Sequence, residues 1–512
     1  MSALRTKLQY FSDNTILVIC VIMASSLTMR MYLYPYGIPL SLDALNAYFL
    51  YASDTSILGH FPQGLANNGW PGFLSIFFSI FHFETSMEYM DLQRIISISF
   101  SILTVIPVYY LGRKFFDKHY SILCAVIFAF EPRLIQNSLL GITEPMFLFL
   151  IAVSLNLFFA GNKKTYISFI VVGLSALVRS EGLFLLFGIT ALLIIQNRKQ
   201  LKKMFFKVTV SVGLFIFTIL PMSVIRFMIN GNDSLTGRFI AEGGKIIIKA
   251  NQESVSTNLI LIFVEGLKNP LMLLGWSSVP LFIFFIPASI IAIIKDRNKN
   301  FLLLIIILGF MMIPAFYGLS VGPDTRYIFP LYPLFSVISV YIIKKIFDKR
   351  ISKKILLVMI IGSIVLSSST FLYLKHTDLA HEKEAFEISK QVIQTRAIND
   401  YGEESKYVRA TSFVDKPLML SGSLWRGPIT FEINGYQSLQ EFIDKNRNDG
   451  LDYIVVDGKP NRPVFLNDVF YNEQKYSYLK KVYDSLDYGY SYHVKIFKID
   501  YEKFTLNTKI KS

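Results

Sequence analysis

Charged residues are scarce in this chain of 512 amino acids, since Asp, Glu, Lys and Arg make up only 17% of it, against about 25% in soluble domains. Hydrophobic residues make up 53%, and the mean hydropathy is +0.45. A soluble protein could not bury this much apolar surface, because single cores stop growing near about 250–300 residues. The composition excludes an ordinary soluble enzyme, a disordered chain and a fibrous repeat, and predicts a polytopic membrane protein.

Cysteine is nearly absent. Cys20 and Cys124 are the only two, which excludes a disulfide scaffold and a zinc cluster. Both lie inside apolar runs, where a cysteine usually acts as a small buried hydrophobic residue. A cleavable signal is not expected either, since the first apolar run is too long and no small-residue cleavage site follows it.

Long apolar runs recur along the sequence. A bilayer core of about 30 Å needs roughly 20 apolar residues per spanning helix. Eleven membrane spans are predicted on this basis, of which those at 119–131, 165–179 and 182–196 are the shortest. The predicted ranges are 14–34, 92–112, 119–131, 144–160, 165–179, 182–196, 208–228, 275–294, 301–320, 328–346 and 355–374.

The basic residues indicate the orientation. The net charge is +14, and Lys and Arg gather in alternate short loops, as they do on the cytoplasmic side of membrane proteins. This pattern makes nucleic-acid binding a poor explanation of the charge. It predicts a cytoplasmic N-terminus in an integral, multi-pass protein of the plasma membrane. The basic segments are 5–7, 113–118, 163–164, 198–207, 295–299 and 344–354.

Three longer segments then fall outside, at about 35–91, 229–274 and 375–512. The last is richer in Asp, Glu, Lys, Asn and Tyr. Residues 381–398 have helical periodicity, whereas 451–456 and 492–499 are typical of strands. We therefore expect a transmembrane domain over 1–374, including the outer loop 35–91, and a small extracytoplasmic α/β domain over 375–512.

Asp43 is the first acid after the first span. The stretches 44–52 and 73–83 that follow it are amphipathic or apolar, and two membrane-surface helices would explain them. Asp43 could cap the first of these helices, since Asp is a preferred N-cap residue. It could equally serve as a catalytic base, and the two roles are compatible.

A second acid, Glu144, stands before Pro145 at the start of a span. Proline suits the first helical turn, but Glu is a mediocre cap, so capping alone does not explain the carboxylate. One hypothesis is that Glu144 faces Asp43 across a polar cleft. Glu131 and Arg133 lie nearby in the sequence and could form an interfacial ion pair, or Arg133 could line the same cleft.

Further charges lie at other span ends. Arg179 and Glu181 interrupt an apolar stretch, and charges at membrane depth usually face a partner or a cavity. They could pair with each other or line a substrate cleft. Arg94 and Arg326 could bind a phosphate through a two-pronged guanidinium or simply extend to the lipid headgroups. Tyr327 could cover such a site.

The order of these motifs resembles a known class of enzymes. An acid follows the first span, and the motifs LQRIISISFSILTVIPVYYLGRKFFD, PRLIQNS, TEP, LVRSEGL and DTRYIFPLYP come next, with a small outer domain at the end. This arrangement resembles the GT-C membrane glycosyltransferases, in particular the protein O-mannosyltransferase-like branch, to which the lipid A aminoarabinose transferases are related. The similarity covers roughly residues 10–346.

The resemblance implies inverting transfer of a sugar from a polyprenyl-phosphate donor to a hydroxyl of a protein, lipid or glycan on the outer face. Asp43 then matches the loop-one acid that acts as base, Glu144 the second acid, and Arg94 and Arg326 the basic positions near the donor phosphate. The loop-one acid is single here, whereas many members have two. The WWDxG motif of oligosaccharyltransferases is absent, which argues against transfer of a whole glycan to asparagine.

The chemistry agrees with these positions. Fixed cations stabilise a phosphate that leaves with negative charge, and a carboxylate can accept the proton of the acceptor hydroxyl. No cofactor and no obligatory metal are expected, because two carboxylates alone bind hard cations weakly. A transporter or flippase of polyprenyl-linked glycans is the main alternative, although charges at span ends and the lack of an internal repeat argue against it. A structural or receptor role leaves these charged residues without a common purpose.

Overall fold

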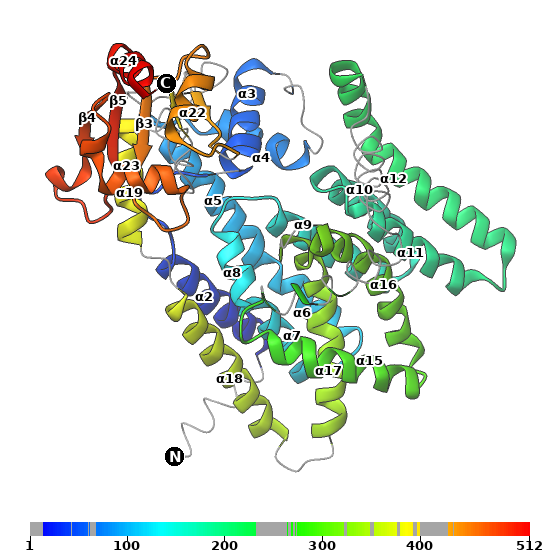
Figure 1. Cartoon of the computed structure of the whole chain (residues 1–512). Coiled ribbons are helices and arrows are strands. Elements are labelled where there is room, and N and C mark those ends of the chain that lie inside the picture. The colour runs from blue at the N-terminus through cyan, green and yellow to red at the C-terminus, as the bar shows by residue number, and fades with distance from the viewer. Residues whose placement is uncertain are drawn as a thin grey trace. The chain divides into compact units, whose positions relative to one another are not determined.

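A computed structural model gives the fold of the protein (Figure 1). It describes residues 14–41, 43–59, 61, 68–231, 264, 268–269, 272, 274–321, 325–348, 353–375, 379–392, 397–399, 429–433 and 435–511. The chain divides into two compact units. Unit 1 comprises residues 1–34, 58–77 and 93–376, and unit 2 comprises residues 35–57, 78–92 and 377–512. Most of the predicted outer segment 229–274 lies outside the described residues.

Each of the eleven predicted spans contains a helix. Among the described residues six helical stretches are long and apolar enough to cross a bilayer, and five shorter apolar helices accompany them. The helices that cover the predicted spans are α2 (Thr15–Tyr32), α5 (Ser86–Leu103) with α6 (Val105–Arg113), α7 (Lys118–Ala129), α9 (Glu144–Ala160), α10 (Asn162–Val178), α11 (Gly182–Asn197), α12 (Leu201–Asn230), η2 (Leu281–Phe285) with α15 (Ile286–Lys295), α16 (Lys299–Val321), η4 (Phe329–Leu331) with α17 (Tyr332–Phe347), and α18 (Lys353–Leu374).

Sequence signals explain where several of these helices begin. The Asp117 carboxylate accepts hydrogen bonds from the backbone N–H groups of His119 and Tyr120 and so caps α7. Between α7 and α9 lies the short helix α8 (Pro132–Ser138), which Glu131 caps. Proline stands in the first turn of both α8 and α9, where its missing N–H costs nothing.

A buried arginine joins three helices of unit 1. The Arg30 side chain, at the end of α2, is almost completely buried. It donates hydrogen bonds to Ser101 on α5 (2.8 Å) and to Ser138 on α8 (3.0 Å), as well as to the carbonyl of Ser26 (3.1 Å). These bonds replace the water that the guanidinium loses on burial, and they fix α2 against its two neighbours.

The first loop contributes helices to both predicted surface stretches. They are the π-helix η1 (Ala44–Phe49), continued by α3 (Leu50–Leu58), and α4 (Gly69–Ile80). Within unit 2, Phe49 packs edge-on against Phe78 at 5.6 Å, and Phe78 packs against Tyr89 at 5.3 Å. Large aromatic contacts of this kind hold the parts of the loop that belong to unit 2.

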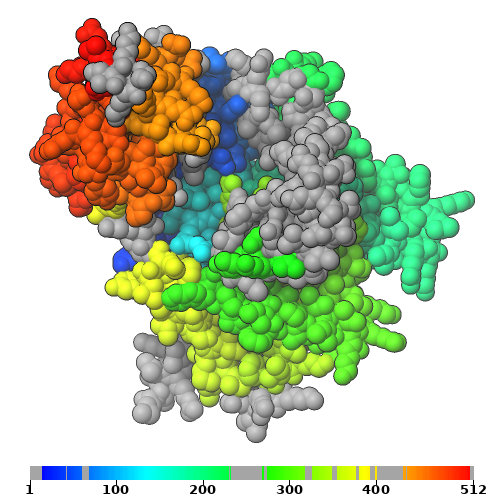
Figure 2. All heavy atoms as spheres, viewed as in Figure 1, coloured from blue at the N-terminus to red at the C-terminus, as the bar shows by residue number. Residues whose placement is uncertain are grey.

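The C-terminal part of unit 2 is a small α/β fold, as predicted. Its described strands form one five-stranded sheet in the order β2-β1-β3-β5-β4, in which β1 is parallel to β2 and β3, and β5 is antiparallel to β3 and β4. In Figure 2 the atoms of its described residues from 429 onward are orange to red. The elements are α19 (Leu379–Val392), β1 (Ala397–Asn399), β2 (Ile429–Phe431), α22 (Leu439–Asn446), β3 (Tyr453–Val456), α23 (Val464–Tyr471), η6 (Glu473–Lys475), β4 (Leu479–Asp484), η7 (Ser485–Tyr488), β5 (Lys495–Ile499) and α24 (Tyr501–Lys511).

One part of this domain differs from the sequence prediction. Helical periodicity was expected through residue 398, yet α19 ends at Val392 and residues 397–399 form strand β1. The Asn399 amide exchanges two hydrogen bonds with the backbone of Val455, and Ile398 is completely buried. Pairing with β2 and β3 therefore decides the conformation of this segment over its local periodicity.

Candidate functional site

Three helix ends of unit 1 meet at a buried ionic cluster. Glu144 begins α9, Arg179 follows α10, and Glu181 precedes α11. Thr143 and Tyr327 complete the group, which we call the Glu144 cluster. Four of these five residues were singled out in the sequence, and the structure brings those four together.

Arg179 is the centre of the cluster. Its guanidinium forms an ion pair with Glu144 and a second one with Glu181, in which Nη2 lies 2.6 Å from Oε1. Nε also donates to Glu181 (3.2 Å), and Nη1 donates to Thr143 Oγ1 (3.3 Å). The ring of Tyr327 lies 5.9 Å from the guanidinium carbon, within the range of a cation–π contact.

The cluster is well shielded from solvent. The side chains of Glu144, Glu181 and Arg179 are 1%, 11% and 13% exposed. Both acids lie at helix N-termini, where the partial positive charge of the backbone favours a carboxylate. Two carboxylates share one guanidinium, so these three side chains carry a net charge of −1 when ionised. A buried arrangement of this kind is costly unless it is paired and hydrogen-bonded.

The tight turn between α10 and α11 depends on a glycine. A Cβ atom added to Gly182 would lie 2.6 Å from the backbone nitrogen of Ala176. The close approach lets Arg179 and Glu181 meet within the three-residue turn 179–181. The predicted mutual ion pair is thus confirmed, while the bond from Arg179 to Glu144, 35 residues away, was not foreseen.

The two predicted phosphate-binding arginines lie in other elements of unit 1. Arg94 is buried on α5, next to Gln93, whose amide donates to the carbonyl of Gly141 in the turn before α9 (2.7 Å). Arg326 is half-buried in the 3-10 helix η3 (Thr325–Tyr327). Since Tyr327 contacts Arg179, the element that holds Arg326 touches the Glu144 cluster.

Asp43 belongs to unit 2. It is exposed, its backbone is already helical (φ −60°, ψ −34°), and its side chain does not cap η1. The N-cap interpretation therefore finds no support in the structure. Asp43 belongs to unit 2 and Glu144 to unit 1. Their predicted approach therefore stays a prediction.

Glu131 and Arg133 do not form the ion pair that was considered for them. The buried Glu131 carboxylate accepts the backbone N–H of Arg133 (3.3 Å) and the hydroxyl of Ser278. The Arg133 guanidinium donates to Gln136 (3.1 Å) and stacks on the ring of Phe371 at 5.2 Å. No sequence pattern points to Ser278 as a partner, because it lies 147 residues from Glu131.

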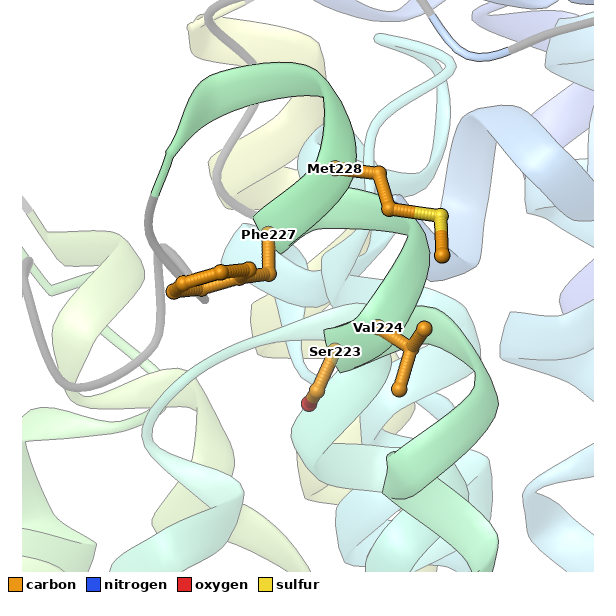
Figure 3. A pocket seen from close by; sticks show the side chains of 4 residues that line it. All are labelled: Ser223, Val224, Phe227 and Met228. Atoms are coloured by element: carbon orange, nitrogen blue, oxygen red, sulfur yellow. The ribbon is translucent and has the colours of Figure 1, made fainter.

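Two other features bear on what the site could hold. No group of three or more His, Cys, Asp or Glu side chains within the described ranges is arranged to bind a metal ion. A hollow on α12 is lined by Ser223, Val224, Phe227 and Met228 (Figure 3). It contains no titratable side chain and cannot support acid–base chemistry.

Comparison with known proteins gives the family context. The family model of the dolichyl-phosphate-mannose-protein mannosyltransferases matches residues 70–222, a range that includes Arg94, Glu144, Arg179 and Glu181. A comparison with curated proteins found no match.

Solved structures give a wider similarity. An oligosaccharyltransferase of Archaeoglobus fulgidus in complex with zinc and sulfate has a TM-score of 0.57 at 14% identity, over 86% of this chain and 68% of that one. The AglB oligosaccharyltransferase of that organism with an inhibitory peptide and a dolichol-phosphate gives 0.57 at 12%, over 88% and 70%. ArnT from Cupriavidus metallidurans bound to undecaprenyl phosphate gives 0.53 at 12%, over 94% and 97%. The chain is thus an integral membrane protein with the fold of the GT-C glycosyltransferases, the class that its motifs resemble.

Proposed function

We propose that the protein is a glycosyltransferase that moves a sugar from a polyprenyl-phosphate donor to an acceptor hydroxyl at the outer face of the membrane. The observation that carries this proposal is the fold shared with ArnT over nearly the full length of both chains, in a structure that contains undecaprenyl phosphate. The family match over residues 70–222 supports it independently.

The proposed reaction is a single displacement with inversion. The acceptor oxygen attacks the anomeric carbon, its proton passes to the Asp43 carboxylate, and the bond from that carbon to the phosphate oxygen breaks. Polyprenyl phosphate leaves with the electron pair, and the cations Arg94 and Arg326 stabilise the charge that develops. Glu144 is the second acid of the site.

The Glu144 cluster supports this assignment by positioning the phosphate-binding turn. Glu144 and Glu181 hold Arg179 in place, and Arg179 contacts Tyr327, the neighbour of Arg326. Through Tyr327 the cluster supports the element that carries Arg326, and a cation held on such a preorganised element suits electrostatic stabilisation of a transition state.

Replacement of Asp43 tests the base. Asp43→Asn keeps the shape of the side chain but cannot accept a proton, so transfer should fall by about 10²–10⁴-fold, while binding of the donor lipid stays nearly unchanged. Transfer is measured as release of polyprenyl phosphate by purified protein in the presence of acceptor. Turnover at the wild-type rate in this variant would show that Asp43 is not the base.

Replacement of Arg326 tests the phosphate contact. Lysine supplies the charge without the planar fork, so Arg326→Lys should weaken use of the donor moderately and Arg326→Ala severely. Because the phosphate gains charge in the transition state, the alanine variant should have a lower kcat as well as a higher KM. An unchanged kcat/KM in well-folded Arg326→Ala would remove this residue from the site.

A transporter or flippase would give a different result in the same assay, because it would move donor lipid without releasing polyprenyl phosphate. The proposed reaction also uses no metal. Activity should therefore persist in EDTA, and its loss, with recovery on adding a divalent cation, would overturn that part of the proposal.

A further inference from the structure

A groove separates the ends of the first and last spans of unit 1. It has a volume of about 550 Å³ and is lined by Ser25, Thr28, Met29, Tyr32 and Leu33 of α2 and by Ser369, Leu372 and Tyr373 of α18. We call it the α2–α18 groove. Both helices are long and apolar enough to span the bilayer, and only 22% of each is buried within the protein. The groove therefore opens toward the lipid.

Aromatic side chains mark the depth of the groove in the membrane. Tyr32 and Tyr373 are each 70% exposed, and they lie at the C-terminal ends of α2 and α18. Trp276 is 49% exposed and packs edge-on against Phe371, the neighbour of Leu372, at 5.4 Å. Exposed tyrosine and tryptophan gather at the level of the lipid headgroups. This end of the groove thus lies at the membrane surface, and its remainder lies in the hydrocarbon.

A cation stands behind that end of the groove. Leu372 packs with Phe371, Met29 and Leu33 in one small core. The Arg133 guanidinium stacks on the Phe371 ring of that core, 5.2 Å from the ring centroid. Arg133 makes no ion pair among the described residues, and its side chain is only half-buried. An anionic headgroup would supply the missing counter-charge.

We propose that the α2–α18 groove binds one acyl chain of a diacyl phospholipid, with the lipid phosphate held by Arg133. The lining residues 25–33 of α2 cover about 12 Å of helix, close to the depth of one leaflet of a bilayer core about 30 Å thick. The length suits an acyl chain of one leaflet better than a much longer polyprenyl chain. This site goes beyond the transfer reaction, and it does not involve Asp43 or Arg326.

Photolabelling tests the proposal. The purified full-length protein is placed in phosphatidylcholine vesicles that contain diacyl phosphatidylglycerol with a diazirine in one acyl chain. After irradiation, labelled peptides are mapped by mass spectrometry. We expect labelling concentrated in residues 25–33 and 369–373. Ser369→Trp should abolish it by filling the groove, and Arg133→Gln should reduce it several-fold, with Arg133→Lys intermediate.

The hollow on α12 provides a matched control. It is also apolar and contains a serine, and it shares no lining residue with the α2–α18 groove, so Ser223→Trp should leave labelling of that groove unchanged. Labelling that does not concentrate in the groove, or that Arg133→Gln leaves intact, would overturn the proposal. Polyprenyl phosphate and unlabelled phosphatidylglycerol are then compared as competitors of the probe. If polyprenyl phosphate displaces the probe at the lower concentration, the groove belongs to the donor lipid. Protection of the groove by a copurified membrane protein would assign it to a partner helix.

None of these outcomes depends on whether the protein transfers sugar. The labelling experiment needs neither donor nor acceptor, whereas the Asp43→Asn experiment measures transfer alone. Failure of the lipid site and failure of the proposed reaction can therefore be told apart.

Discussion

Removal of Arg179 should destabilise unit 1 more than removal of either acid that it binds. Removing one partner of a buried ion pair lowers the free energy of unfolding by about 3–5 kcal/mol. Arg179→Met leaves both Glu144 and Glu181 without their guanidinium, so the loss should lie near the upper end of that range. In Glu144→Gln, Arg179 keeps its 2.6 Å contact with Glu181, and the loss should be about 1–3 kcal/mol.

The double variant gives the sharpest test. With both Glu144→Gln and Arg179→Met, no charge on Glu144 remains to be compensated, so the combined loss should be smaller than the sum of the single losses by about 0.5–3 kcal/mol. Equilibrium unfolding in mixed detergent micelles measures these free energies. The buried thiol of Cys124 can report unfolding through a thiol-reactive dye, once the exposed Cys20 has been replaced by serine.

The test depends on the order of the losses in unfolding free energy among the variants. If Arg179→Met unfolds no more readily than Glu144→Gln, Arg179 does not compensate two carboxylates, and the account of the cluster is wrong. Strict additivity in the double variant would show that Glu144 and Arg179 are not coupled. Lys345→Met serves as a control, because its ion pair with Asp296 is 48% and 33% exposed and should contribute little.

Three further predictions concern other parts of the chain. Gly182→Ala should lower the free energy of unfolding by about 1–3 kcal/mol through crowding against the backbone of Ala176, and the unfolding assay above measures it. Arg30→Met should lower the free energy of unfolding in the same assay, since three helices lose a shared hydrogen-bonding group. Arg30→Lys should recover only part of that loss. Hydrogen bonds from three side chains, those of Tyr476, Lys475 and Asn472, lower the pKa of Asp468 to about 2. Because this folded-state pKa is below the unfolded value of about 4, Asp468 stabilises the fold above that pH, and the benefit is lost as pH falls from about 4 to about 2. The difference in melting temperature between wild type and Asp468→Asn, followed by circular dichroism, should therefore be present at pH 5–7 and shrink across that window.

The sequence predicts the helices of this protein well, because membrane spans are long apolar runs whose ends are marked by charge. It also predicts the pairing of Arg179 with Glu181, since only Ser180 separates them. It cannot predict the partner of a side chain that is distant along the chain. The bonds from Arg179 to Glu144 and from Ser278 to Glu131 depend on helix packing, which hydropathy does not encode. Strand β1 was missed for the same reason, since pairing with two neighbours determines it.

The Glu144 cluster has a consequence for biosynthesis. Glu144 enters the membrane with α9, while its partner Arg179 is 35 residues further along the chain and is synthesised later. An unpaired acid at the middle of a span would cost several kcal/mol during insertion. Glu144 instead occupies the first turn of its helix, where it can stay near water until Arg179 arrives. The order of synthesis therefore favours an acid at the edge of the bilayer, and the ion pair closes only when the hairpin of α10 and α11 has been delivered.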